Sequence, residues 1–395
     1  MRRLGPYPAF YLSFFGFFAV SRSFFAIHCK DIGFSAFEIG VITSAEDLAT
    51  IIGPLVGIHA ATVWLAPKNL VVLATALSIL IYLPLFGVDS FVAVLTLWFL
   101  ACSLMRAPLM LVEAQAITDA IRQNLHYGRI RIWGSVGFLV ATWLLGISLD
   151  LFGPGSILWV GLFLLILVLY SVYLVKPALS NERGGAGERV ASSSFLRVCL
   201  RPEYANIKWL LIVSALHWGS MGTFYAYFSL YLRALGFGGS IIGVAWMVSI
   251  IGELFAFTWY HHLERRFSQL FLLRASILLL AVRWVMLWYS DSLGWILASQ
   301  ILHVFPIVSF SIPSMKLAHQ FFPEEFRSQA QGILIAIGLG VGVFLGRILA
   351  GFGALFISSD AELDTLFLLS AMMAMVSYFY SRRIKEVDVA QDGAK

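Results

Sequence analysis

The chain has 395 residues, of which 60% are hydrophobic and only 12% are charged. Soluble domains usually carry about 25% charged residues, so this composition excludes an ordinary soluble fold and predicts a polytopic membrane protein. The net charge of +5 would suggest a nucleic-acid partner in a soluble protein, but here the basic residues lie in short loops between apolar runs, as in membrane proteins.

Apolar runs of about 20 residues are long enough for an α-helix to cross the hydrocarbon core of a bilayer. The sequence contains twelve such runs and therefore predicts an all-α polytopic membrane protein with twelve transmembrane helices. The first run passes into a loop without a small-residue cleavage site, so we expect a retained helix rather than a signal peptide. The expected spans are 7–28, 37–62, 68–88, 91–118, 129–149, 155–176, 207–232, 240–260, 268–289, 294–317, 328–357 and 362–381.

The charge of the loops predicts the orientation of the chain. Loops on the side of the N-terminus hold most of the loop arginines and lysines, whereas the opposite loops contain only two basic residues, Lys30 and Arg233. Basic loops stay in the cytoplasm, so we expect both termini to be cytoplasmic and the protein to lie in the cytoplasmic (inner) membrane.

One long polar connection divides the chain into two sets of six expected helices. It includes the segment SNERGGAGERVASSS and is typical of a flexible cytoplasmic linker. The predicted organisation is an N-terminal bundle at 1–178, a linker at 179–206 and a C-terminal bundle at 207–395.

The two halves contain a repeated segment. DIGFSAFEIGV at 31–41 aligns with ALGFGGSIIGV at 234–244 at a constant offset of 203 residues. Each copy lies between the first and second expected helices of its half. Two six-helix repeats around a central cavity are an arrangement found in secondary transporters.

Four motifs resemble the major facilitator superfamily, in particular its lactose permease, nucleoside–proton symporter and phenylpropionate permease group. HYGRIRIWGSVGF at 126–138 is similar to the signature between the fourth and fifth helices of that group. The segments GELFAF, AVRWV and LHVF resemble its eighth, ninth and tenth helices. The resemblance covers essentially the whole chain and implies transport by alternating access, in which the two halves rock against each other.

The first candidate site is for substrate and comprises Glu113, Arg131 and Arg106. Glu113 stands 18 residues before Arg131, and the resemblance implies that this glutamate and arginine contact substrate. Both lie within roughly 10 Å of the same membrane surface, so they can form an ion pair. Arg106 precedes Glu113 by seven residues, shares its helix face and has no assigned partner. It could receive a polar or anionic group of the substrate, while the alternative is that Glu113 and Arg131 merely lock two helices together.

The second candidate site is for protons and comprises Glu253, His303 and Arg283. The resemblance implies a proton-handling network at these positions, and Glu253 is a carboxyl group in otherwise apolar surroundings. Lactose permease has a proton-translocating glutamate three residues after its histidine, whereas this chain has Pro306 there. Glu253 is therefore the best remaining proton carrier, although His303 could instead be a hydrogen-bonded core residue.

A third set of charges, Arg22, Glu46 and Asp47, is expected to be buried within the first two helices. Two carboxylates against one arginine would leave one acid protonated or bonded elsewhere. An outer gate or structural ion pair is at least as compatible with this set as a substrate contact. Arg347 on the eleventh helix has no acid assigned to it, and its role is left open.

The sequence therefore predicts a proton-coupled symporter that imports a small organic solute, such as an aromatic carboxylate, a sugar or a nucleoside. The direction of transport rests on the resemblance alone. Alternatives are a proton-driven exporter and a membrane solute sensor that has lost transport. The expected partners are the solute, protons and the lipid bilayer, with no nucleic acid and with a monomeric chain.

An enzyme is not expected, because the sequence contains no nucleophile with a nearby base and no phosphate-binding loop. We also expect no cofactor and no metal site. The three cysteines, Cys29, Cys102 and Cys199, lie in separate segments without the spacing of metal ligands.

Overall fold

The computed structural model describes residues 4–63, 65–175, 201, 204–289, 291–323 and 326–386. Every regular element in these ranges is a helix. The predicted linker at 179–206 lies mostly outside the described residues, as does Cys199.

The first half forms six helical spans in chain order. The first span consists of α1 (Tyr7–Ala19), the π-helix η1 (Val20–Phe24) and α2 (Phe25–Asp31). The others are α3 (Ala36–Val63), α4 (Pro67–Tyr82) with the short η2 (Leu83–Phe86), α5 (Phe91–Arg122), α6 (Gly128–Phe152) and α7 (Ser156–Leu174).

The second half repeats this pattern with α9 (Ala205–Ala234), α10 (Gly239–Glu264), α11 (Gln269–Tyr289) and α16 (Thr365–Ser381). Its fourth span is broken into α12 (Leu293–Ile301) and α13 (Val304–Phe321). Its fifth span consists of α14 (Arg327–Ile335), the π-helix η5 (Ala336–Gly342) and α15 (Val343–Gly353), followed by the short η6 (Ala354–Phe356) and η7 (Asp360–Glu362).

The twelve-helix membrane architecture predicted from the sequence is confirmed. Within the described residues, eleven of the spans are long and apolar enough to cross a membrane. The remaining span, α9, has 30 residues but carries more polar side chains, and most of it is buried against other helices. A helix surrounded by protein needs no apolar surface for lipid, which explains how α9 crosses with a weaker hydropathy signal.

The sequence repeat corresponds to one turn that occurs twice. Gly33 follows α2 with φ +99°, and Gly236 follows α9 with φ +84°. The next residue donates its N–H to a carbonyl five residues back in both copies, from Phe34 to Cys29 and from Phe237 to Leu232. This is a Schellman-type helix end, which favours glycine because glycine adopts positive φ without strain.

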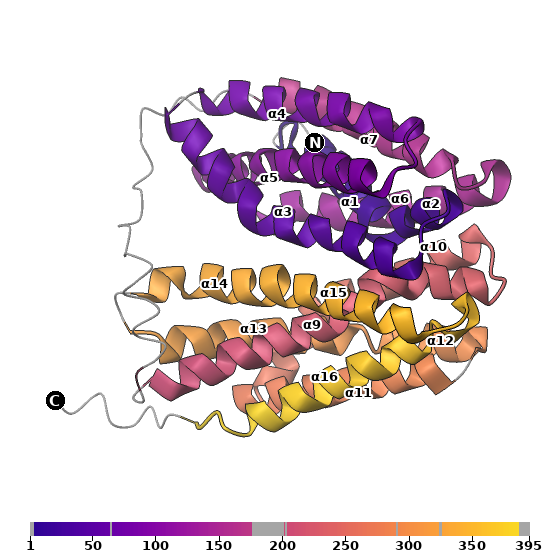
Figure 1. Ribbon diagram of the computed structural model, residues 1–395. Coiled ribbons are helices and arrows are strands. Elements are labelled where there is room, and N and C mark those ends of the chain that lie inside the picture. Colours follow the sequence, from indigo (N-terminus) through magenta and orange to yellow (C-terminus); the bar gives the residue numbers. More distant parts are fainter. Residues whose placement is uncertain are drawn as a thin grey trace.

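The two halves form two layers of helices, with α1–α7 above and α9–α16 below (Figure 1). We call the end of the bundle where α7 ends and α9 begins the linker end, and the opposite end, with the turns at Gly33 and Gly236, the far end. In Figure 1 the layers converge toward the far end, where α2, α10 and α15 lie.

Close backbone contacts join the halves at the far end. A Cβ atom on Gly40 of α3 would lie 2.9 Å from Cα of Gly351 in α15. A Cβ atom on Gly146 of α6 would meet the carbonyl oxygen of Gly239 in α10 and lie 3.1 Å from Cα of Ser240. Only residues without side chains allow backbones to approach this closely, so these glycines determine how tightly the far end closes.

Polar contacts reinforce the same seam. The Asp150 carboxylate of α6 accepts hydrogen bonds from the first N–H groups of α10, including that of Ser240 at 2.8 Å. Lys30 and Asp360 form an ion pair between the halves with an N–O distance of 2.8 Å. The structure is therefore closed at the far end.

Candidate functional site

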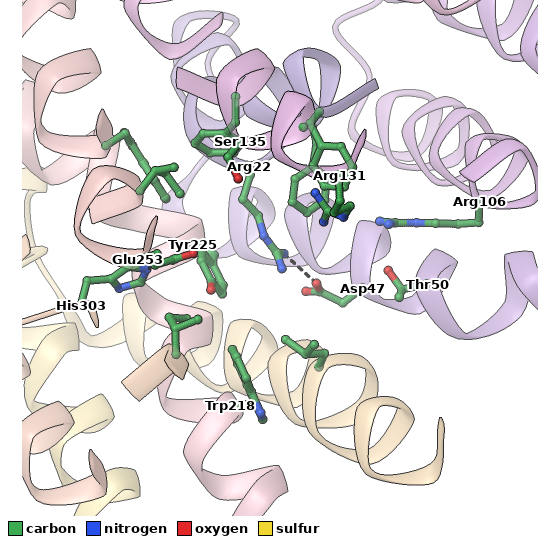
Figure 2. Close-up of a pocket in the computed structure, with 18 residues that line it drawn as sticks. Arg22, Asp47, Thr50, Arg106, Arg131, Ser135, Trp218, Tyr225, Glu253 and His303 are labelled. Carbon is green, nitrogen blue, oxygen red and sulfur yellow. Dashed lines mark hydrogen bonds and ion pairs between the residues drawn. The ribbon is translucent and has the colours of Figure 1, made fainter. Parts of the chain in front are cut away.

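A cavity of about 390 Å³ lies between the two halves, on the linker side of the far-end seam (Figure 2). On each of α3, α6, α9, α10 and the η5–α15 span, the residues that line the cavity lie closer to the linker end than those that form the seam. The lining residues are Phe15, Phe18, Arg22, Asp47, Thr50, Arg106, Arg131, Gly134, Ser135, Phe138, Trp218, Tyr225, Trp246, Ile250, Glu253, His303, Ile307 and Leu339.

Five charged side chains form a buried cluster beside this cavity. Arg22 Nη1 lies 2.9 Å from Asp47 Oδ1, and Arg347 Nε lies 3.1 Å from Asp47 Oδ2. Arg106 Nη2 lies 3.5 Å from Glu46 Oε1, and Arg347 Nη1 lies 3.8 Å from Glu46 Oε2. Arg347 comes from the second half and the other four come from the first, so the cluster spans the interface between the halves.

The structure gives Arg106, which had no partner assigned from the sequence, a contact with Glu46. One expectation about these charges was wrong. The two carboxylates were expected to outnumber a single arginine, but they face three arginines, because Arg347 reaches across from α15 and Arg106 from α5. The sequence signal for this contact was Arg347 itself, because a buried arginine with no acid on its own helix requires a partner on another helix.

The π-helix η1 positions Arg22 within this cluster. Its backbone hydrogen bonds skip one residue further than in an α-helix, as in the bond from Phe25 N–H to the Val20 carbonyl. The wider turn changes which carbonyls are paired within the helix, and the Ser23 carbonyl accepts a hydrogen bond from the Ser229 hydroxyl of the second half. The helix thus gives the interface one backbone acceptor next to Arg22.

Glu113 and Arg131 lie close together, as their spacing predicted. Arg131 Nε is 4.0 Å from Glu113 Oε1, and both side chains are more than one third exposed. Tyr127 donates a 2.6 Å hydrogen bond to the same glutamate oxygen. Burial, together with this hydrogen bond, raises the pKa of Tyr127, so the phenol remains a donor at neutral pH.

The guanidinium of Arg131 stacks on an aromatic ring at the edge of the cavity. Its Cζ lies 4.1 Å from the centroid of Phe15, and a Cβ atom on Gly134 would lie only 2.6 Å from Arg131 Nη1. Gly134 therefore leaves the space that this guanidinium occupies. Arg131 and Arg106 line the cavity, whereas Glu113 is not among its lining residues, so the role of Glu113 in substrate binding stays a prediction.

Glu253 and His303 form a pair on the opposite wall of the cavity, as Figure 2 shows. His303 Nε2 lies 3.3 Å from Glu253 Oε1, so Glu253 does not stand alone in apolar surroundings. The break between α12 and α13 falls at Leu302 and His303. Pro306 has no N–H to bond the Leu302 carbonyl, which explains why the helix is interrupted here.

Arg283 lies apart from this pair. It donates to the Ser299 carbonyl at 3.0 Å and to Gln300 Oε1 at 3.0 Å, and its Cζ lies 4.1 Å from the centroid of the Phe224 ring. The same ring also packs against His303, at a centroid distance of 5.4 Å. Phe224 therefore contacts both groups, and within the described ranges Arg283 has no carboxylate at ion-pair distance.

Aromatic rings form much of the remaining cavity wall. Trp218, Tyr225 and Trp246 of the second half line it, together with phenylalanines of the first half. The sequence did not identify these phenylalanines, because aromatic residues are common on every surface of a membrane protein. The cavity thus combines charged groups at its edges with an apolar wall.

The comparisons with known proteins agree with this architecture. The sequence model of the MFS_1 like family matches residues 5–363. The chain is 26% identical over 346 residues to the probable 3-phenylpropionic acid transporter of Escherichia coli (strain K12), covering 87% of this chain and 89% of that protein. It is also 26% identical over 351 residues to the maltose permease of Geobacillus stearothermophilus, covering 88% of this chain and 86% of that protein.

Solved transporter structures share the fold. The crystal structure of the nucleoside transporter NupG is similar with a TM-score of 0.84 and 17% sequence identity, covering 98% of this chain and 100% of that chain. An auto-inhibited POT family peptide transporter is similar with a TM-score of 0.70 and 14% identity, covering 99% of each chain.

Proposed function

The chain belongs to the MFS_1 like family, and we propose that it is a proton-coupled symporter that imports a small organic carboxylate with an aromatic body. The family membership makes it a multi-pass membrane transporter of small organic solutes rather than an enzyme. The observation that carries the finer proposal is a single cavity with arginines, an aromatic wall and the Glu253–His303 pair.

The arginines of the cavity wall support an anionic substrate. Three arginines line the cavity, against the carboxyl groups of Asp47 and Glu253. A carboxylate is held well by arginine, because the planar guanidinium donates two parallel hydrogen bonds to its two oxygens. The arginines concerned are Arg22, Arg106 and Arg131.

The aromatic wall supports an apolar body for the substrate. Ligand pockets are usually lined by hydrophobic and aromatic side chains, with a few polar groups that fix orientation. The name of one relative, a probable 3-phenylpropionic acid transporter, describes a molecule of this kind, with a carboxylate on an aromatic body. The maltose permease and the nucleoside transporter keep sugars and nucleosides as the alternative substrate classes.

The Glu253–His303 pair is the proposed proton site. Its members are 3.3 Å apart and face the cavity that the substrate would occupy. A proton on the carboxyl group removes its negative charge, which changes its interaction with His303 and with an anion in the cavity. Arg283 is expected to act at a distance, through its positive charge, rather than by direct contact with Glu253.

Orientation and direction are also parts of the proposal. The basic loops support a cytoplasmic linker end, cytoplasmic termini and a location in the inner membrane. The far-end seam would then close the cavity from outside, as in an inward-facing state. We propose a monomer, because the substrate cavity is built between the two halves of one chain.

Transport in reconstituted vesicles tests the proposal. Radiolabelled 3-phenylpropionate should exchange by counterflow without a gradient and should accumulate when the outside is more acidic. Maltose and uridine, at the same concentration, should compete poorly. Accumulation that occurs only when the inside is more acidic would favour a proton-driven exporter. Binding without exchange would favour a solute sensor.

A further inference from the structure

Asp47 is shared by two arginines that belong to opposite halves of the protein. Its Oδ1 atom faces Arg22 of the first half at 2.9 Å, and its Oδ2 atom faces Arg347 of the second half at 3.1 Å. The Asp47 side chain is only 2% exposed and that of Arg347 is fully buried. A ligand or a mutation that weakens the Arg22–Asp47 ion pair must therefore change the Asp47–Arg347 ion pair between the halves.

The cluster contains one more positive charge than its acids can neutralise. Among the residues that the structure describes, Arg22, Arg106 and Arg347 form ion pairs with Glu46 and Asp47 only. Within the described ranges, Arg347 Nε and Nη2 and the acid oxygens Asp47 Oδ2 and Glu46 Oε2 have no hydrogen-bond partner, so Arg347 contacts these acids as an ion pair, while its Nη1 donates to the Thr43 carbonyl. A buried surplus charge favours the arrival of an anion, because in a medium of low dielectric constant an opposite charge is strongly stabilising.

An anion from the cavity can reach only part of the cluster. Arg22 and Arg106 line the cavity, with side chains 11% and 12% exposed, whereas Arg347 is sealed behind them. Both cavity-facing guanidinium groups lie within 6 Å of the Phe18 ring centroid, at 5.2 Å and 5.8 Å. This places two arginines around one ring, where a carboxylate on an aromatic body would find both kinds of contact.

Tyr225 gives Arg22 a second attachment. The Arg22 Cζ atom lies 4.0 Å from the centroid of the Tyr225 ring, which belongs to α9 of the second half and also lies 5.9 Å from Cζ of Arg347. A guanidinium on an aromatic face is stabilised without a carboxylate. Arg22 can therefore leave Asp47 while remaining at the cavity wall, close to its position in Figure 2.

We propose that Asp47 is transferred from Arg22 to Arg347 when the carboxylate of a substrate binds Arg22, and that this transfer couples occupancy of the cavity to closure of the far end. The inference rests on the proposed function for the negative charge of the substrate. With substrate bound, Asp47 has only Arg347 as its arginine partner, which strengthens the ion pair between the halves. Without substrate, Arg22 competes for Asp47 and weakens that pair, which lets the far end open.

Coupling of this kind is reciprocal, so a change in the Asp47–Arg347 ion pair must also change the affinity for substrate. This determines whether each variant should bind an anion more or less tightly. Asp47→Asn removes the competitor for Arg22, so it should bind an anion at least as tightly as the wild-type protein while losing the link between the halves. Arg347→Gln leaves two arginines against two acids, so it should weaken anion binding although Arg347 does not line the cavity. The expected loss is about fivefold or more, the lower limit of common coupling strengths.

Two measurements on purified, full-length protein test the proposal. The first is the Kd of 3-phenylpropionate, measured by isothermal titration. The second is the distance between spin labels on Ser90→Cys and Ser359→Cys, which are exposed at the far end of opposite halves, in a background without the native cysteines. In the wild-type background, substrate should increase the population with the shorter distance.

The variants separate coupling from simple binding. In Arg347→Gln, a saturating concentration of 3-phenylpropionate should no longer shift the distance. The double variant Asp47→Asn/Arg347→Gln removes one charge of each sign, so it is the variant of choice if a single change impairs folding, and it should bind the probe without a shift. Lys30→Gln is the matched control, because it removes an ion pair between the halves that lies outside the cavity and should retain the substrate-induced shift.

Two results would overturn the proposal while the proposed function stands. One is weaker 3-phenylpropionate binding in Asp47→Asn or in the double variant, and the other is unchanged affinity together with an unchanged shift in Arg347→Gln. If the wild-type protein binds no carboxylate but binds maltose or uridine, the substrate class in the proposed function is wrong and this inference is overturned with it.

Discussion

The ion pair between Arg347 Nε and Asp47 Oδ2, at 3.1 Å, joins the two halves of the protein at the wall of its central cavity. Alternating access requires that such contacts break and re-form in each cycle, so their strength must be matched to the free energy that substrate binding supplies. Glycine contacts, polar contacts and this ion pair all hold the same far end closed.

The glycine contact between α6 and α10 predicts a shift of the conformational equilibrium. In Gly146→Ala, the new methyl group would meet the Gly239 carbonyl, and overpacking of this kind destabilises the closed state by about 1–3 kcal/mol. Spin labels at Ser90→Cys and Ser359→Cys should report a larger open population. Gly294→Ala is the control, since a methyl group there meets no atom within 4 Å, and an equal shift in both variants would contradict the prediction.

Glu253→Gln should separate transport from proton coupling. The amide cannot exchange a proton, so accumulation driven by a proton gradient should fall to background while counterflow of 3-phenylpropionate persists. Glu264→Gln serves as the control, because Glu264 is on the same helix but pairs with Lys316 at the linker end. Full accumulation by Glu253→Gln would show that the proton is carried elsewhere.

Arg131→Lys should weaken substrate binding while it retains the positive charge. A lysine cannot donate the two parallel hydrogen bonds of a guanidinium or stack as a plane on Phe15. Loss of a hydrogen bond to a charged group is worth about 1.5–3 kcal/mol, so the Kd of 3-phenylpropionate should rise about tenfold or more. Arg129→Lys, on the exposed side of the same helix, should leave the Kd unchanged. An unchanged Kd in Arg131→Lys would remove this residue from the site.

Much of the architecture could be predicted from the sequence, because the bilayer imposes a length and a polarity on each helix. The depth of Glu113 and Arg131 also follows from counting residues along their helices, and their side chains are 4.0 Å apart. The contact between Asp47 and Arg347 could not be found in this way. It joins helices 300 residues apart, and its geometry depends on how the halves pack.

Departures from regular helix geometry were the second feature that was not predicted from the sequence. The span that contains His303 was expected to be continuous, but it is broken at Leu302 and His303, and His303 lies 3.3 Å from Glu253. Pro306 is the sequence signal for this break, because its nitrogen cannot donate a hydrogen bond to the Leu302 carbonyl. The π-helix around Arg22 has no comparable sequence signal, because Val20–Phe24 contains neither proline nor glycine.

Tyr127→Phe tests whether Glu113 contacts substrate or only orders the helices around Arg131. The change removes the 2.6 Å hydrogen bond to Glu113 and the 2.9 Å contact with the Tyr11 hydroxyl, without altering the cavity lining. If Glu113 has a structural role, thermal unfolding in detergent should show a loss of about 1–2 kcal/mol, while the Kd of 3-phenylpropionate stays the same. Tyr289→Phe is the control, because that side chain is 76% exposed. A higher Kd without a loss of stability would instead place Glu113 in contact with substrate. In that case the hydrogen bond from Tyr127 orients the Glu113 carboxylate for the ligand, and its loss lowers affinity without lowering stability.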